Sequence, residues 1–337
     1  MERNHTIIIE VTRGDMVESR HRCHAAIVDS TGKVLDSWGD VDQYIYPRSS
    51  IKPLQALPLI ETGAADALGV SDPEIALACA SHMSEPHHVD TVRAWLDRIG
   101  LGPGNLECGG HLPRHEGAAA DVIRAGIAPD AAFNNCSGKH SGFLTTAGHL
   151  GEATQGYIDD DHPVQARLAA ILSDLGGVDL SGSARGHDGC GIPVIGMPLV
   201  AMARALARMA DPEGLGGPRA RAAETIFRCM TTHPEYVRGT GGFDTAAMRA
   251  GSGRFATKTG AEGIHAAIVP ELNIGIALKI EDGGGRASDV AVGALLGRLG
   301  VIDDVGRAAL RDFLEVPISN ATGRNVGSIR IADGWAE

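Results

Sequence analysis

Segments with strand character occur at both ends of this chain, and helical patterns fill the long stretch between them. Near the N-terminus, "TIIIEVT", "CHAAIVD" and "VLDSWGD" read as strands, and the turn "STGK" joins the last two into an antiparallel hairpin. A strand leading to Lys258, a hairpin turning at "PELN" and a last strand, "VGSIRIAD", follow near the C-terminus. This order predicts an α+β fold with an antiparallel sheet flanked by helices. We expect one domain over residues 1–337, with a helical subregion at about 53–240.

Charge and cysteine content narrow the class of protein. The formal net charge of −12 gives no basic surface for nucleic acid or an anionic membrane. No stretch is apolar enough to span a bilayer, and the N-terminus has no leader-like apolar run. The six cysteines are scattered, which favours free or metal-bound thiols in a reducing compartment. We expect a cytoplasmic protein whose partner is a small molecule or a second copy of the chain.

Lysine is rare in this sequence. Only five of the 30 basic residues are lysines. Arginine stays charged at any useful pH, whereas burial can turn a lysine into a neutral base or ligand. Each lysine therefore merits inspection, although coding bias explains Lys33 and Lys279 adequately.

The stretch "RSSIKPLQ" places Ser49 three residues before Lys52 at a predicted helix start. This spacing brings the amine near the hydroxyl, and desolvation can lower the lysine pKa until it accepts the serine proton. A simple polar start to a surface helix explains the same residues.

A second motif, Lys258-Thr259-Gly260, lies on an apparent strand far downstream. Serine acyl-transfer enzymes of the penicillin-interacting type combine a Ser-x-x-Lys helix with a Lys-Thr-Gly strand in one cleft. The usual middle Ser-x-Asn element is absent, but Ser81 follows an apolar run and can supply a second hydroxyl, or act only as a cap.

A third group consists of Cys136, Lys139 and His140 in "NNCSGKHSG" and of His187, Asp188 and Cys190 in "GHDGCG". Thiolates and imidazoles at these positions can bind zinc, but buried cysteines and loop histidines explain them as well. The histidines in "SHMSEPHH" read as polar residues at a helix start, which we expect Ser84 to cap.

The motifs "PRSSIKPLQ", "CASHMSEPHH", "NNCSGKHSGFL", "GHDGCGIP" and "KTGAEG" together resemble the rhizobial-type asparaginase family, also called asparaginase II or class 3, over about residues 8–332. The resemblance implies hydrolysis of L-asparagine to L-aspartate and ammonia by a homodimer whose fold is similar to serine β-lactamases and glutaminases. It implies two Ser–Lys pairs, Ser49 with Lys52 and Ser81 with Lys258. It also implies zinc near the substrate, bound by residues matching Cys136, Lys139 and Cys190, with Asp188 adjacent.

Our hypothesis is that Ser49 attacks the carboxamide, that Lys52 takes its proton, and that Ser81 and Lys258 relay the proton and then activate water. We expect Arg48, His140 and Asp188 to contact the substrate. Two alternatives stay open. One is a serine glutaminase or penicillin-interacting hydrolase, and the other is a non-catalytic, zinc-dependent amino-acid sensor.

Overall fold

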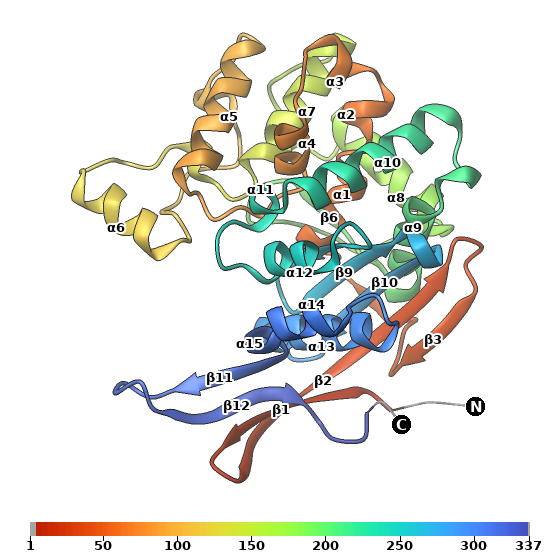
Figure 1. Cartoon of the computed structure of the whole chain (residues 1–337). Coiled ribbons are helices and arrows are strands. Elements are labelled where there is room, and N and C mark those ends of the chain that lie inside the picture. Colours follow the sequence, from red (N-terminus) through yellow and green to blue (C-terminus); the bar gives the residue numbers. More distant parts are fainter. Residues whose placement is uncertain (1–4, 336–337) are drawn as a thin grey trace.

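An eight-stranded antiparallel sheet is built from both ends of the chain in the computed structural model, which describes residues 5–335 (Figure 1). Its strand order is β11-β12-β1-β2-β10-β9-β8, and β3 pairs with β2. The strands are β1 (Ile7–Arg13), β2 (Met16–Asp29), β3 (Val34–Trp38), β8 (Ala256–Thr259), β9 (Ile264–Val269), β10 (Ile274–Ile280), β11 (Glu315–Ser319) and β12 (Asn325–Ile331).

The N- and C-terminal strands close the sheet, as the sequence predicts. In the β1–β12 pair, Ile9 lies opposite Ile331. In the β2–β3 hairpin, the Asp29 carboxylate accepts hydrogen bonds from the backbone amides of Thr31 and Lys33, which fixes the tight turn. Strand β11 was not predicted, because its exposed edge position requires few apolar residues. The α+β prediction is therefore confirmed, with one additional edge strand.

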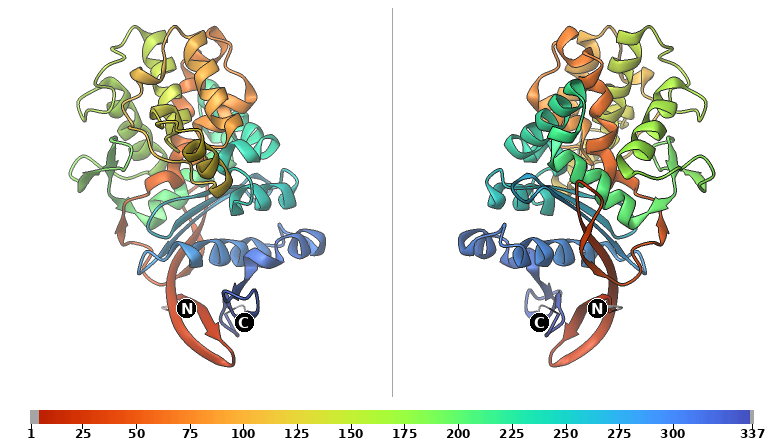
Figure 2. Two further views of the ribbon diagram at one scale, coloured as in Figure 1. Left: turned by 90° about the vertical axis from the view of Figure 1, so that its left-hand side faces the viewer. Right: turned by 90° about the vertical axis from the view of Figure 1, so that its right-hand side faces the viewer.

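Helices cover both faces of the sheet because β10 carries apolar side chains on both sides (Figure 2). Ile276 and Leu278 face α13 (Gly285–Arg298), while Ala277 faces α9 (Leu199–Ala210). On the α9 side, a side chain at Gly275 would collide with the α9 backbone, since its Cβ would lie 2.2 Å from the Ala203 carbonyl oxygen. Glycine at this position lets the helix approach the strand closely.

The remaining helices form a thick layer above the α9 face of the sheet, apart from α14 and α15, which lie beside α13, and α12, which packs at the β8 edge and contributes Phe243 and Ala247 to the α13-side cluster (Figure 1). They are α1 (Lys52–Gln55), α2 (Leu57–Glu61), α3 (Ala64–Ala67), α4 (Asp72–Ala78), α5 (Pro86–Arg98), α6 (Glu116–Arg124), α7 (Ser137–Leu150), α8 (Pro163–Gly176), α10 (Gly217–Thr232), α11 (Pro234–Arg238), α12 (Phe243–Gly251), α14 (Asp304–Ala309) and α15 (Arg311–Leu314). Short 3₁₀ turns are η1 (Arg48–Ile51), η2 (Pro103–Asn105), η3 (Ala131–Phe133), η4 (Pro212–Gly214) and η5 (Pro270–Leu272). Two small strand pairs lie at the side of this layer, β4 (Tyr44–Ile45) with β7 (Met197–Pro198) and β5 (Arg185–His187) with β6 (Pro193–Ile195).

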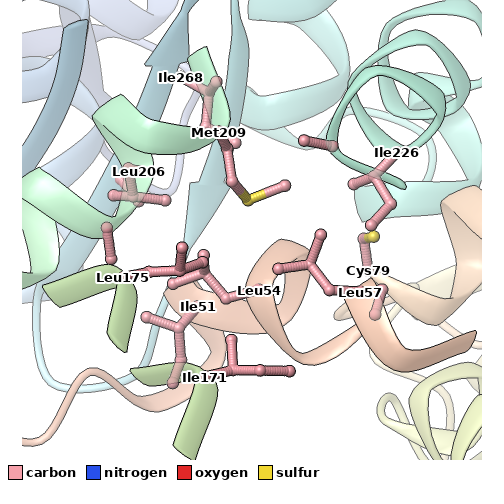
Figure 3. Close-up of a cluster of buried hydrophobic side chains, with 14 of the residues drawn as sticks. Ile51, Leu54, Leu57, Cys79, Ile171, Leu175, Leu206, Met209, Ile226 and Ile268 are labelled. Carbon is pink, nitrogen blue, oxygen red and sulfur yellow. The ribbon is translucent and has the colours of Figure 1, made fainter. Parts of the chain in front are cut away.

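A buried apolar cluster anchors η1, α1 and α2 to the rest of the molecule (Figure 3). Ile51, Leu54 and Leu57 pack among side chains of α8, α9, α10 and β9, including Leu206 and Met209. The apolar stripe of α9 is thus core packing, as its helical spacing predicts. Because this cluster holds η1 and α1, it also fixes the position of Ser49 and Lys52.

Two helix starts differ from the sequence prediction. The helix expected from Ser49 is divided into η1, α1 and α2, and proline at position 58 removes one amide donor at the junction of α1 and α2. Ser84 does not cap α5, and that prediction was wrong. Its backbone has φ +58° and its hydroxyl donates to the Phe133 carbonyl, while α5 begins at Pro86 with Glu85 as the cap residue.

All six cysteines are free and buried, in agreement with the prediction of unpaired thiols. None of the helices within residues 5–335 is long and apolar enough to cross a lipid bilayer.

We predict that Leu206→Ala destabilises the protein by about 2–5 kcal/mol, since it removes a fully buried side chain from the cluster that joins the sheet to the helical layer. The urea midpoint of unfolding, followed by circular dichroism, measures this loss. Val305→Ala is the control, because Val305 is exposed and the change should lie within about 0.5 kcal/mol. Equal midpoints for the two variants would contradict the prediction.

Candidate active site

A cavity of about 580 Å³ lies where η1, the loop after α4 and the end of β8 meet. Ser49 lines the cavity from η1, Ser81 from the loop after α4, and Thr259 from β8. The wall also includes three of the other predicted residues, Cys136, Asp188 and Cys190, together with Arg48. Segments predicted from separate motifs therefore meet at one cavity of a size typical for small ligands.

Three lysine side chains lie beneath the wall of this cavity. Lys52, Lys139 and Lys258 are 0 %, 2 % and 1 % exposed. The Lys258 amine donates to the Ser81 hydroxyl over 2.9 Å and to the Thr259 carbonyl over 2.6 Å. The Lys52 amine reaches the same Ser81 hydroxyl over 3.1 Å, and it also donates to the Ala80 carbonyl. The Ser81 oxygen therefore lies between two buried amines.

Burial changes the protonation of these amines. Desolvation lowers the pKa of Lys52, an effect that the nearby Cys136 sulfur partly opposes. Desolvation lowers the pKa of Lys258 further, well below its usual value, although the Asp244 carboxylate opposes it. A lysine with a lowered pKa can be neutral near neutral pH and can accept a proton from a hydroxyl. Ser81 thus has two amines of this kind within hydrogen-bond distance.

Ser49 lies differently. It lines the cavity from η1, three residues before Lys52, but within residues 5–335 its hydroxyl makes no hydrogen bond, and the Lys52 amine points to Ser81. The pairing of Ser49 with Lys52 stays a prediction. The pairing of Ser81 with Lys258 has the contact that it requires.

Cys136, Lys139 and Cys190 converge at the floor of the cavity, although Cys190 comes from a distant loop. The Lys139 amine lies 3.0 Å from the Cys190 sulfur, and the Cys190 thiol hydrogen-bonds to Cys136. Cys190 thus contacts both other residues, and two sulfur donors with one nitrogen donor are a donor set that zinc accepts. The residues present therefore fit a zinc ion.

The protonation of this cluster is unusual. The hydrogen bond from Cys190 lowers the pKa of Cys136 well below that of a free thiol, and the neighbouring lysines add to the effect. The same hydrogen bond and burial raise the pKa of Cys190. Burial by itself lowers the pKa of Lys139, but the two sulfurs raise it above its usual value. These shifts favour a thiolate on Cys136 and an ammonium group on Lys139, which would have to lose its proton to bind a metal.

The three residues predicted to contact the substrate lie in different surroundings. Arg48 donates two hydrogen bonds to Asp188, at 2.9 and 3.2 Å, so the two charges compensate each other at the cavity wall. His140 lies on α7 and is fully buried, and its Nδ1 lies 2.7 Å from the Tyr157 hydroxyl. It does not line the cavity, and its Nε2 has no hydrogen-bond partner within the described chain.

Glu85, His87 and His88 lie close enough to suggest a second metal site. However, both ring nitrogens of His88 are in use, because Nδ1 accepts from the Glu85 amide and Nε2 donates to the Glu235 carbonyl. The Glu85 carboxylate accepts from the amide and hydroxyl of Thr240. These residues are structural, in agreement with their interpretation as polar residues at a helix start.

One part of the site was missed by sequence reasoning. The Asp244 carboxylate accepts from the Thr259 amide over 3.0 Å and from His265 Nε2 over 2.8 Å, and both Asp244 and His265 are fully buried. The pair supports β8 directly behind Lys258. Asp244 lies on α12 and belongs to no recognisable motif. Only the position of His265 among the apolar residues of β9 could have indicated that the imidazole has an acidic partner.

The charges of this pair depend on each other. Burial by itself raises the pKa of Asp244, but the His265 charge and hydrogen bond lower it far below its ordinary value. Burial lowers the pKa of His265, but Asp244 raises it above the ordinary value. The depressed Asp244 pKa contributes stability above about pH 4 that is lost as the pH falls, and the raised His265 pKa contributes stability that is complete below about pH 6.5 and is lost as the pH rises through its folded-state value.

We therefore predict that Asp244→Asn costs about 3–5 kcal/mol near pH 5–6, because it removes the buried carboxylate partner of the His265 imidazolium and leaves only Asp289, 3.3 Å from Nδ1. The cost should shrink at higher pH, as His265 loses its proton. Apparent melting temperatures of wild type and variant between pH 4.5 and 9 measure the difference, with the exposed Asp121→Asn as a control. A cost that does not vary with pH would contradict the assigned ion pair.

Comparisons with solved structures find weak similarity over most of the chain. A putative β-lactamase from Bacteroides dorei has 14 % identity and a TM-score of 0.43, covering 77 % of this chain and 84 % of that one. A β-lactamase from Mycobacterium bovis has 14 % identity and a TM-score of 0.39, covering 87 % and 95 %. A D-alanine carboxypeptidase from Burkholderia cenocepacia has 14 % identity and a TM-score of 0.37, covering 87 % and 92 %.

A comparison with curated protein sequences finds no match. The model of one protein family, described as L-asparaginase II, matches residues 9–331. This range includes each of the motifs that line or underlie the cavity. The chain therefore belongs to the L-asparaginase II family, which places it among the hydrolases.

Proposed function

We propose that this protein is an L-asparagine amidohydrolase that releases L-aspartate and ammonia by a Ser–Lys mechanism. The observation that carries the proposal is the Ser81 hydroxyl, which lies between the buried amines of Lys52 and Lys258 at the wall of the cavity. Membership of the L-asparaginase II family indicates the substrate.

In the first step, Ser49 attacks the side-chain carboxamide carbon and forms a C–O bond. Lys52 takes the hydroxyl proton, since it is three residues away and its pKa is lowered by burial. Hydrogen bonds of catalytic groups often form only when substrate is bound, so the present direction of Lys52 toward Ser81 does not exclude this role. The hydrogen-bonded series Lys52, Ser81 and Lys258 then supplies a route for the proton to the departing ammonia.

In the second step, water attacks the acyl ester, and the Ser81–Lys258 pair accepts its proton while Ser49 recovers its own. Aspartate is released. The Lys258 amine is held in place by the Thr259 backbone. The Thr259 carbonyl accepts from this amine, and the Thr259 amide donates to the Asp244 carboxylate. The chain thus has the proton donors and acceptors for both steps, and the atoms of the amide and of water balance.

We further propose that Cys136, Lys139 and Cys190 hold a zinc ion beside the substrate, with Asp188 adjacent. When bound, zinc would polarise a neighbouring carbonyl or orient the substrate. The support for this proposal is the convergence of two sulfurs and one amine at the cavity floor. Zinc would displace the protons of Lys139 and Cys190, so its affinity should rise with pH.

The substrate's ammonium group has an acidic partner in Asp188, which keeps one carboxylate oxygen free of the Arg48 contact. The contact of His140 with the substrate stays a prediction, since His140 is fully buried and does not line the cavity. We expect the chain to act as a single catalytic domain and, from the family resemblance, as a cytoplasmic homodimer.

We predict that Ser49→Ala lowers kcat for ammonia release from L-asparagine by at least about 10⁴-fold, as expected for a nucleophile. Ser81→Ala should lower kcat by about 10²–10⁴-fold, as expected for a proton carrier. Ser50→Ala is the matched control, because the adjacent Ser50 hydroxyl donates to the Pro47 carbonyl away from the cavity.

Rapid acid quench and peptide mapping identify the serine that carries the aspartyl group. An acyl group on Ser81 would reverse the two roles. Faster turnover of L-glutamine or of a chromogenic β-lactam than of L-asparagine would refute the proposed substrate, and tight asparagine binding without ammonia release would indicate a sensor.

We also predict that the purified protein contains roughly one zinc ion per chain and that Cys190→Ser loses most of it. Elemental analysis measures the content, and the melting temperature of wild type should fall on chelation. Cys108→Ser is the control, since Cys108 is buried nearby but donates to the Ala131 carbonyl. Equal zinc contents in the two variants would refute the assigned ligands.

A further inference from the structure

Four arginines line the cavity, and two of them contact no other side chain through a hydrogen bond or an ion pair within residues 5–335. Arg48 donates to Asp188, and Arg286 donates to His21 and Ser19. The remaining two, Arg114 and Arg238, form no ion pair within residues 5–335. Arginines on a protein surface commonly find carboxylates, so two unpaired guanidinium groups at one cavity suggest an anionic ligand.

Arg238 is fixed beside Ser81. It is the last residue of α11, and its guanidinium lies 3.4 Å from the Ser81 carbonyl oxygen. The Ser81 amide in turn donates to the Val237 carbonyl over 3.0 Å. Gly242 leaves room for the arginine stem, because a Cβ at this position would lie 2.3 Å from Arg238 Cγ. The guanidinium therefore lies against the backbone of Ser81, and its stem passes close to Gly242.

Arg114 approaches from another loop. Its backbone amide donates to the Met83 carbonyl over 3.1 Å, so it is attached to the same segment that carries Ser81. Burial lowers the pKa of Arg114, and the Arg238 charge lowers it further, which places the two cations within electrostatic range of each other. Two like charges facing one cavity repel each other unless an anion lies between them. The structure thus contains a local cost that a carboxylate would remove.

We propose that Arg114 and Arg238 form the subsite for the α-carboxylate of the substrate amino acid. This inference rests on the proposed function, because it deepens the binding mode of the same substrate. The acidic side chains of the cavity lie on other segments, at Asp188, Glu262 and Asp289, where they can face the α-ammonium group. The cavity thus offers both cationic and acidic side chains, which matches the two charged ends of a free amino acid.

A specificity follows from this arrangement. A free α-carboxylate is required, so asparagine within a peptide chain, whose carboxyl group is an amide, loses the two guanidinium contacts. As ligands of the α-carboxylate, both arginines bind the substrate away from the scissile amide. Their loss should therefore raise KM far more than it lowers kcat.

The test compares two ligands that differ only in the group at issue, L-aspartate and its α-amide, L-isoasparagine. Isothermal titration calorimetry of the purified wild type should show at least 10-fold tighter binding of L-aspartate. Arg238→Met and Arg114→Met should each reduce this preference about 10-fold, and Arg238→Lys should restore part of it. Arg286→Met is the control, since it removes one positive charge from the same cavity but leaves the proposed subsite intact.

The kinetic counterpart is KM for L-asparagine, which should rise about 10- to 100-fold in the two variants at nearly constant kcat. Persistence of the full carboxylate preference in both variants, or its equal loss in Arg286→Met, would overturn the subsite. Ammonia release by wild type without a carboxylate preference refutes only this inference. A carboxylate preference without ammonia release refutes only the proposed function.

Discussion

The burial of lysine amines beneath one cavity is the constraint on which the rest of the structure depends. An ammonium group removed from water without a partner is expensive, so each amine must be neutral or surrounded by acceptors. Lys52 and Lys258 meet this requirement with carbonyl groups and the Ser81 hydroxyl, and Lys139 meets it with cysteine sulfur. The same surroundings that make burial tolerable also place a hydroxyl between two amines of lowered pKa.

Such an arrangement requires that several segments be held rigidly. The helical cluster around Leu206 fixes η1 and α1, and therefore Lys52. The Asp244–His265 pair fixes β8, and therefore Lys258. Ser81 lies on the loop between these supports, where its amide and carbonyl contact α11. The sheet and the helical layer thus determine the distances at the cavity, although neither forms its wall alone.

The sequence was informative where residue type limits chemistry. The strand patterns at both ends predicted an antiparallel sheet built from both termini, and the scarcity of lysine drew attention to Lys52, Lys139 and Lys258. It was less informative where a residue acts through a distant partner. The Lys52 amine contacts the Ser81 hydroxyl, although the two residues are 29 positions apart in the sequence. No local sequence pattern indicates such a contact. Likewise Ser84 has the composition of a helix cap, but a tertiary contact with Phe133 places its hydroxyl elsewhere.

By itself, the sequence determined the fold class, the candidate nucleophiles and the candidate zinc donors, because strand periodicity and reactive residue types are local properties. Only the tertiary structure decided which amine contacts which hydroxyl, which arginines have partners, and that Arg114 and Arg238 face the same cavity as Ser81. These are properties of packing between segments far apart in the chain. Charge compensation depends on distance in space, and an arginine in the sequence looks the same whether or not a carboxylate lies beside it.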